Sequence, residues 1–228
     1  MNIFTKINKS RMSLIKCLSL LAFVFFLISC SDSLPHLTSV TGIVVLDFAD
    51  EKSFPTERLA VFAETESEIQ RVAKITATHE SSGLEWVCLA PQKYADGDKK
   101  NWVGYTNFVA QEGKNLPVGE YKFLYEDLAG EESELYFNVT YPKGVLEKYS
   151  TELPDAIPLS KGEKLSEKIA IYDVEQKLIY WGDRKKSWKK DSDIFNDLGT
   201  AQIYRKCYVS QGSSVVYMLP EINLHGEN

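Results

Sequence analysis

Hydrophobic and polar residues alternate with a period of two through much of the chain between residues 42 and 142. Such alternation is typical of strands that bury one face. The alternating segments are rich in β-branched and aromatic residues, which favour strands. Residues 69–78 also fit a helix face, but their β-branched residues favour a strand from Val72 onward. We therefore predict strands at residues 42–48, 58–63, 72–78, 84–89, 102–110, 116–125 and 135–141.

The clearest local signal is a predicted hairpin. Tyr121, Phe123 and Tyr125 occupy every second position of one run, and a second alternating run covers residues 135–141. An Asp- and Gly-containing turn at residues 126–131 separates the two runs. Two alternating runs around such a turn predict an antiparallel hairpin.

The start of this hairpin, Pro117-Val118-Gly119-Glu120-Tyr121, resembles the last hairpin of immunoglobulin-like and fibronectin-III-like sandwiches. Trp86 shares a strand face with Leu84 and Cys88, because side chains two positions apart point the same way. It resembles the buried Trp of an early central strand in those domains. The resemblance covers residues 42–142 and implies an Ig-like antiparallel β-sandwich with a buried Trp86.

The pattern changes after Pro142. Residues 143–166 hold prolines, a glycine and scattered charges, which indicates a linker or a draped loop. Beyond it we predict strands at 169–172 and 177–181, then a short helix that Asp191–Ser192 caps and that continues through Leu198 until Gly199 ends it. A final hairpin is predicted at 202–209 and 213–219, ended by Pro220. The expected fold is thus mainly β: a sandwich at 42–142 followed by a smaller α+β unit at 167–228.

A different pattern fills residues 14–29, which are almost entirely apolar. Four bases precede or interrupt the run without any acid: Lys6, Lys9, Arg11 and Lys16. The run is short for a spanning helix, which needs about 20 apolar residues. A cationic segment followed by an apolar one and a small residue is an export signal. An ordinary signal peptide and an uncleaved anchor are the alternatives.

The run ends on Leu27-Ile28-Ser29-Cys30, which resembles the lipobox of bacterial lipoproteins. The resemblance implies a signal peptide at residues 1–29, cleavage after Ser29, diacylglycerol on Cys30, and acylation of the new amine by a fatty acid such as palmitate. Residues 30–41 are then a tether. Two or more acyl chains hold a protein stably on a bilayer. Ser31 rather than Asp follows Cys30, which points to the outer membrane under the enterobacterial sorting rule.

Charge and cysteine content narrow the partners. The net charge is −6, and removal of residues 1–29 leaves 22 basic and 32 acidic residues, a net charge of −10. Such a chain repels nucleic acid on average, so we expect no nucleic-acid partner. Cys88 and Cys207 remain after export, where a disulfide is permitted. Two separately buried thiols are the alternative, and no cysteine spacing predicts a metal or another cofactor.

One segment stands out as basic. Arg184, Lys185, Lys186, Lys189 and Lys190 surround Trp188. Bases around an exposed aromatic residue can bind anionic lipid head groups or a polyanionic glycan. The alternative is a solvated loop whose Trp folds back on the core, because Asp183, Asp191 and Asp193 flank it.

Other candidate chemistry is sparse. His36, His79 and His225 have no nucleophile or ligand partner nearby in the sequence. The acids of the 126–132 turn are expected to face water. Asp96-Gly97-Asp98 resembles the start of a calcium loop but lacks the later ligands, so a polar turn is favoured.

We therefore expect a lipid-anchored envelope protein with a non-catalytic role in binding, adhesion or structure. Its predicted partners are the membrane, through the lipid anchor, and an envelope protein or polyanionic glycan. A lipid-anchored enzyme and a scaffold subunit of an outer-membrane complex are the alternatives. A buried His or carboxylate cluster would favour the enzyme, and a large exposed apolar patch would favour the scaffold.

Overall fold

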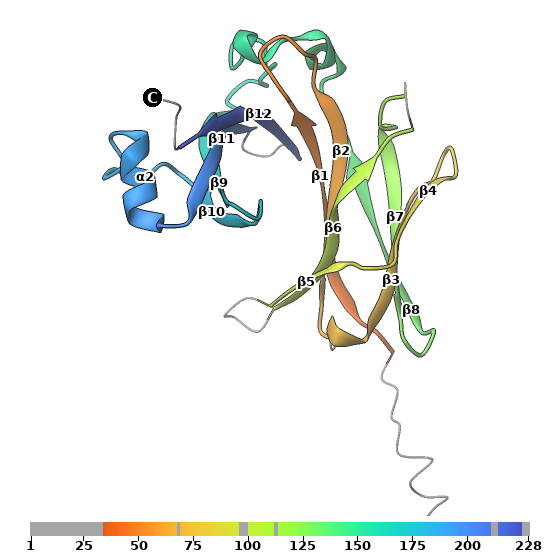
Figure 1. Ribbon diagram of the computed structural model, residues 1–228. Helices are drawn as coiled ribbons and strands as arrows, with labels where there is room; N and C mark the ends of the chain where they lie inside the picture. Colours follow the sequence, from red (N-terminus) through yellow and green to blue (C-terminus); the bar gives the residue numbers. More distant parts are fainter. Residues whose placement is uncertain (1–33, 68, 96–99, 112–113, 211–213, 225–228) are drawn as a thin grey trace, which may run out of the picture. The chain divides into compact units, whose positions relative to one another are not determined.

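A computed structural model describes residues 34–67, 69–95, 100–111, 114–210 and 214–224 (Figure 1). The described residues from Pro35 onward belong to one compact unit. Cys30, the calcium-loop-like Asp96-Gly97-Asp98 and His225 lie outside the described residues.

The fold is mainly β and has two sheets. The eight-stranded sheet contains, in spatial order, β10 (Leu178–Gly182), β9 (Leu165–Asp173), β11 (Ala201–Ser210), β12 (Val215–Asn223), β1 (Leu37–Asp47), β2 (Thr56–Thr65), β6 (Asn101–Val109) and β5 (Gln92–Ala95). The four-stranded sheet contains β4 (Leu84–Cys88), β3 (Val72–His79), β7 (Gly119–Asp127) and β8 (Glu132–Val139).

The two sheets pack face to face over β1, β2, β3, β6 and β7 (Figure 1). Tyr121, Phe123 and Tyr125 of β7 are fully buried, as their alternation predicts. Val44 and Leu46 of β1 enter the same core from the eight-stranded sheet. Each fully buried aromatic or aliphatic side chain of this size contributes roughly 1.5–3 kcal/mol through removal of apolar surface from water.

The predicted hairpin is confirmed: β7 and β8 pair antiparallel from Gly119–Val139 to Glu126–Glu132. Its turn is built by Asp127, whose Oδ1 accepts hydrogen bonds from the backbone N–H groups of Ala129 (2.8 Å) and Glu131 (3.0 Å). Gly130 adopts a φ of +83°, which glycine tolerates without steric cost. The predicted strand from Val72 is also confirmed, after a short 3-10 turn at Ile69–Arg71.

The C-terminal elements follow the predicted order, with the helix α2 (Asp191–Leu198) between the pairs β9–β10 and β11–β12. Gly199 ends α2 with a φ of +62°, as predicted. The helix begins one residue earlier than expected, with Lys190 as N-cap and Asp193 accepting a hydrogen bond from the Lys190 N–H at 2.8 Å. α2 covers the face of β9 and β11 that carries Ile169 and Ile171.

β12 joins the C-terminal strands to the rest of the large sheet. It pairs in parallel with β1, from Val44–Val215 to Asp47–Met218. Strands from both sides of residues 143–166 therefore share one sheet, and the intervening residues form short 3-10 turns at Lys143–Glu147 and Ser150–Glu152. The division into a sandwich domain and a separate C-terminal domain stays a prediction.

Four local expectations were wrong. β1 begins at Leu37, inside the predicted tether, and the edge strand β5 lies between the predicted strands 84–89 and 102–110, where no strand was predicted. Pro220 lies within β12 at a register irregularity opposite Arg205–Cys207, where a residue without an N–H is tolerated. Trp86 lies on the edge strand β4 and is only half-buried, because no strand of the described residues pairs with that edge. Its Nε1 donates to the Val109 carbonyl at 2.6 Å.

Candidate binding cleft

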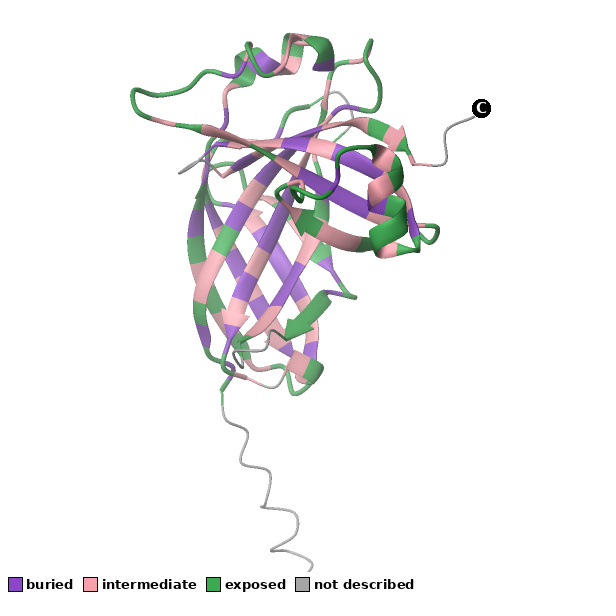
Figure 2. Cartoon of the chain, turned by 90° about the vertical axis from the view of Figure 1, so that its left-hand side faces the viewer, coloured by how far each residue is buried: buried purple, intermediate pink, exposed green. Residues whose placement is uncertain are grey.

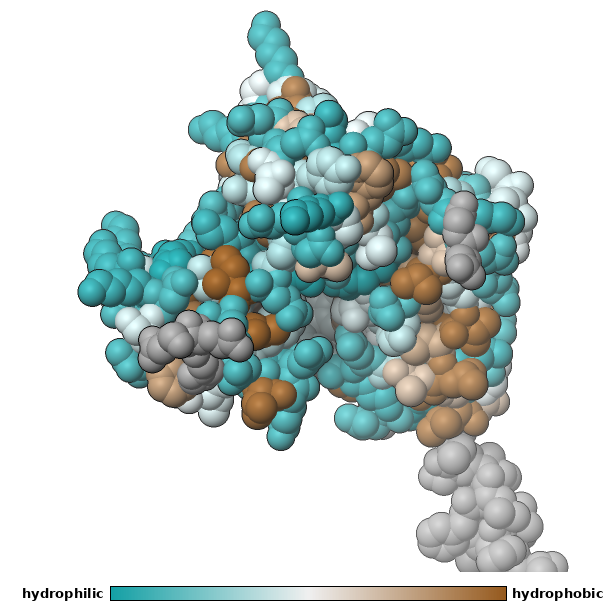
Figure 3. Space-filling model, turned by 45° about the horizontal axis from the view of Figure 1, so that its top comes forward, coloured by the Kyte–Doolittle hydropathy of each residue, from teal (hydrophilic) through white to brown (hydrophobic). Residues whose placement is uncertain are grey.

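The eight-stranded sheet curves around a cleft. Strands at its two opposite edges, β10 and β5, line the same cavity of about 1020 Å³ together with β1, β2, β6, β9 and β12. Two distant edges can border one cavity only if the sheet between them is bent. Figure 3 shows the surface hollowed at this side of the molecule. The volume lies just above the roughly 300–1,000 Å³ usual for small-molecule sites.

The floor of the cleft is the second face of strands whose first face is the sandwich core. In β2, Leu59, Val61 and Ala63 point into the core, whereas Ala60 and Phe62 line the cleft. The same division places Val44 of β1 in the core and Ile43 and Val45 toward the cleft. Figure 2, which turns the left side of Figure 1 toward the viewer, shows this alternation of burial along the long strands.

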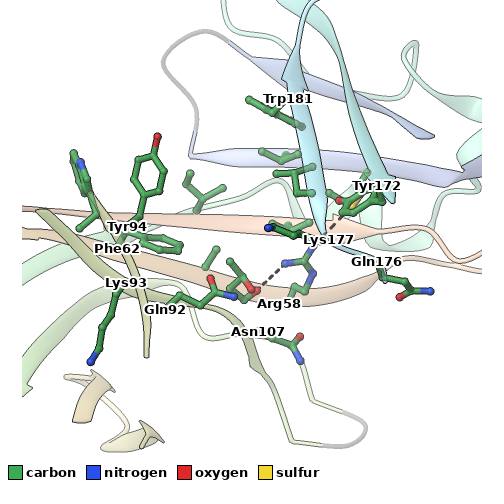
Figure 4. A pocket seen from close by; sticks show the side chains of 18 residues that line it. Arg58, Phe62, Gln92, Lys93, Tyr94, Asn107, Tyr172, Gln176, Lys177 and Trp181 are labelled. Carbon is green, nitrogen blue, oxygen red and sulfur yellow. Dashed lines mark hydrogen bonds between the residues drawn. The ribbon is translucent and has the colours of Figure 1, made fainter. Parts of the chain in front are cut away.

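Aromatic side chains stand on the walls of the cleft (Figure 4). Phe62 and Tyr94 belong to one side, formed by β2 and β5, and Trp102 of β6 also lines the cavity. Tyr172 and Trp181 belong to the other side, formed by β9 and β10. The cleft therefore offers flat apolar surfaces that face a common space.

A charged network closes one end of the floor. Asp47 accepts hydrogen bonds from Arg205 Nη2 at 2.5 Å and from Arg58 Nε at 3.4 Å. Arg58 also donates to the Thr106 carbonyl at 2.7 Å, and Arg205 to the carbonyls of Leu219 and Phe48 at 2.6 and 2.9 Å. Arg205 is 8% exposed, so its charge depends on these partners.

The predicted interfacial role of Trp188 is wrong. Trp188 is 3% exposed and packs with Ile169, Ile171 and Ile194 in the cluster between α2 and the sheet. Its Nε1 donates to Asp197 Oδ2 at 2.8 Å. The indole is buried because α2 and β9 together offer an apolar site beside one carboxylate. The alternative interpretation, in which the Trp folds back on the core, describes this segment.

Two of the five bases around Trp188 are engaged by acids. Arg184 Nη2 lies 2.9 Å from Asp191 Oδ1, and Lys185 Nζ lies 2.8 Å from Asp197 Oδ2. Lys185 Nζ also sits 4.7 Å from the centre of the Trp188 ring. Lys186, Lys189 and Lys190 are exposed and form no ion pair with a described residue. Their attraction to anionic head groups stays a prediction.

The two cysteines are free, so the disulfide that the compartment permits is not present. Cys88 lies in the core between the sheets, whereas Cys207 lies beneath the cleft floor with Val45, Ala170 and Met218. Burial raises the pKa of the Cys207 thiol to about 12. Each thiol behaves as a small core hydrophobe.

The remaining candidates serve structure. His79 is buried, with Nδ1 2.7 Å from Ser82 Oγ and Nε2 3.2 Å from the Val118 carbonyl oxygen. Exposed His36 lies 3.0 Å from Glu66. On the hairpin turn, Asp127 pairs with Arg71 at 2.8 Å, against the expectation that the turn acids only face water.

The described residues offer neither a metal site nor a membrane-spanning helix. No group of three or more His, Cys, Asp or Glu side chains in that part of the chain could hold a metal ion. No helix there has the length and apolar character to cross a bilayer.

Comparison with known proteins gave no relative: no protein-family model, no curated protein and no solved structure matches this chain. The cleft was not predicted from the sequence. One signal for it exists, because β2 carries apolar residues on both faces, Leu59 and Val61 on one and Ala60 and Phe62 on the other. A strand that is apolar on both faces is expected to have both faces covered, by packed protein or by a ligand.

Proposed function

We propose that this chain is a lipid-anchored bacterial envelope protein with a non-catalytic binding role, exerted by the concave cleft. The lipobox-like Leu27-Ile28-Ser29-Cys30 supports acylation at Cys30 after loss of residues 1–29. Ser31 at the next position supports the outer membrane as the destination. Two or three acyl chains then hold the protein on the bilayer.

The binding role rests on one observation, the large cleft whose walls are aromatic and whose polar groups are few. Such a composition is typical of sites that bind small molecules. The described residues that line the cleft include no His, Cys, Ser, Asp or Glu, the side chains that most often act as nucleophile or general base. This composition supports binding over catalysis.

We further propose that the two-sheet core is an Ig-like sandwich that acts as the scaffold of the cleft. The strand orders β1-β2-β6-β5 and β4-β3-β7-β8 correspond to A-B-E-D and C′-C-F-G of that architecture. Tyr121, near the start of β7, donates from its hydroxyl to the Pro117 carbonyl at 2.7 Å. This bond matches the tyrosine corner at the start of strand F in such domains.

The anchor is tested by fatty-acid labelling in a bacterial host. Wild-type chain should incorporate a radiolabelled fatty acid and migrate at the processed size, whereas Cys30→Ser should remain an unlabelled precursor. Cys17→Ser is the matched control and should behave as wild type. Equal label in the wild type and Cys30→Ser would refute the anchor.

The binding role is tested by native mass spectrometry of the protein extracted from its envelope without denaturation. We expect an additional small-molecule mass that disappears on denaturation. Thr106→Trp places a bulky side chain in the cleft and should lose that mass while keeping the wild-type unfolding midpoint. The same additional ligand mass on wild type and on Thr106→Trp would contradict a binding role for the cleft.

A further inference from the structure

The charge of the cleft is unlike that of the chain as a whole. The chain carries 32 acidic and 26 basic residues. Among the described residues that line the cleft there are three bases, Arg58, Lys93 and Lys177, and no acid. This difference in charge favours a negatively charged ligand. The inference rests on the binding role proposed above.

Three contacts with the protein fix the position of the Arg58 guanidinium group. Its Nε lies 3.4 Å from Asp47 Oδ2, one Nη donates to the Thr106 carbonyl at 2.7 Å, and the other lies 3.8 Å from Met218 Sδ. A guanidinium has five N–H groups, so one on each Nη donates to no described residue. The geometry of Arg58 is therefore fixed while part of its donor set stays available.

Asp47 does not cancel the charge of Arg58. The same carboxylate also pairs with Arg205, whose Nη2 lies 2.5 Å from Oδ1. Two guanidinium groups thus share the Asp47 carboxylate, and Glu221 lines the adjoining pocket with them but does not line the cleft itself. A partly buried charge is screened by salt much less than an exposed one.

Lys177 adds a second cation from the turn between β9 and β10. It extends over the cleft in the same part of the view as Arg58 (Figure 4). Its side chain forms no ion pair with a described residue. Lys93 differs, because it points away from the other lining side chains (Figure 4) and its Nζ lies 3.4 Å from the Gln70 carbonyl oxygen.

The aromatic walls suit the apolar part of the same ligand. Trp181 on β10 and Tyr94 on β5 remain 45% and 62% exposed although both line the cleft. A ligand that covers large exposed aromatic side chains removes much apolar surface from water, and this burial favours binding. Cations on the floor and aromatic surfaces on the walls together define an amphiphilic ligand.

We propose that the cleft binds a small amphiphilic anion, whose carboxylate or phosphate group contacts Arg58 and Lys177 and whose apolar body lies between Tyr94 and Trp181. Arg58 offers two N–H groups, one on each Nη, and a carboxylate or phosphate accepts such a pair side by side. Lys177 supplies a mobile point charge that adapts to either head group.

The test uses the full lipidated chain in nanodiscs of neutral phosphatidylcholine, with empty nanodiscs as the blank. Isothermal titration calorimetry compares 2-naphthoate, 2-naphthyl phosphate and the uncharged 2-naphthamide. We expect both anions to bind at least tenfold more tightly than the amide, since a hydrogen bond to a charged group contributes about 1.5–3 kcal/mol, or tenfold and more in Kd. The ratio of the two anions distinguishes the head groups.

Variants locate the site. Lys177→Gln should weaken both anions about tenfold, the loss of one charge-assisted contact, without changing binding of the amide. Trp181→Ala should weaken all three probes. Lys186→Gln, an exposed lysine outside the cleft, is the matched control and should change none of them.

The outcomes separate this inference from the binding role. Equal affinity for the anions and the amide, with Trp181→Ala still weakening both, overturns the anionic preference and leaves the binding role intact. Anion binding that Lys186→Gln weakens as much as Lys177→Gln also overturns the preference. Failure of all three probes to bind the wild type overturns this inference, whereas the native-mass comparison decides the binding role.

Discussion

Two regions of this molecule concentrate positive charge, and they differ in what surrounds the charge. The segment at residues 184–190 holds five bases, but two are paired with acids, and its Trp188 is buried in a core. The cleft has fewer bases, yet its described lining holds no acid, and its aromatic residue Trp181 stays half-exposed.

The contrast teaches that the number of bases in a sequence segment does not measure its ability to bind an anion. Asp191 and Asp197 lie within 3 Å of the first two bases of the segment, so their charges are offset locally. At the cleft, the carboxylate of Asp47 contacts both Arg58 and Arg205, so it does not pair with Arg58 alone. Local pairing, not the count, decides which cations remain available.

The largest expected effect separates the two tryptophans. Trp188→Ala should destabilise the protein by about 3–5 kcal/mol, because it empties a packed site between α2 and the sheet. Trp188→Phe retains most of the packing and should cost only about 1 kcal/mol, for the lost hydrogen bond to Asp197. Urea denaturation followed by circular dichroism measures both. An unchanged midpoint for Trp188→Ala would mean that the Trp188 side chain does not pack in the core.

A slightly smaller effect is expected in the network beneath the cleft. Asp47→Asn leaves the buried Arg205 without its carboxylate and should cost about 3 kcal/mol, as removal of one partner of a buried ion pair does. Glu51→Gln, the same chemical change at a nearby exposed site, is the control and should cost less than about 0.5 kcal/mol. Equal midpoints for the two variants would show that Arg205 does not depend on Asp47.

Trp181→Ala should cost about 1 kcal/mol or less, because a half-exposed side chain on an edge strand gives up little buried surface. The same denaturation experiment measures it beside Trp188→Ala. A loss as large as that of Trp188→Ala would mean that Trp181 is a structural residue, and the contrast between the two regions would collapse.

The smallest expected effect is the pH dependence of an exposed pair. Hydrogen bonds from Lys185 Nζ and then from Trp188 Nε1 lower the pKa of Asp197 below its ordinary value of 3.8. The ionised carboxylate therefore stabilises the fold above pH of about 4, and this contribution is lost as pH falls through the lowered pKa of the folded state.

The measurement compares denaturation midpoints of wild type and Asp197→Asn from pH 7 to pH 3. The difference should stay constant near neutrality and shrink below pH of about 4. Glu175→Gln, at an exposed carboxylate in the β9–β10 turn, serves as the control and should show little difference at any pH. A difference that grows on acidification would contradict the assigned direction of the pKa shift.

Local pattern was enough to predict individual elements. The alternation of Tyr121, Phe123 and Tyr125 and the Asp127 turn predict the β7–β8 hairpin, because its contacts span few residues and its turn chemistry is local. α2 and its end at Gly199 follow from short-range capping in the same way.

Where these elements meet was decided only by tertiary structure. β12 lies beside β1 in parallel although 170 or so residues separate them, and Arg205 reaches Asp47 across 158 positions. The two-residue repeat of a strand predicts which side chains share a face, but it does not predict which strand packs against that face. The cleft exists because β10 and β5 bend toward one cavity, and no periodicity within either strand carries that information.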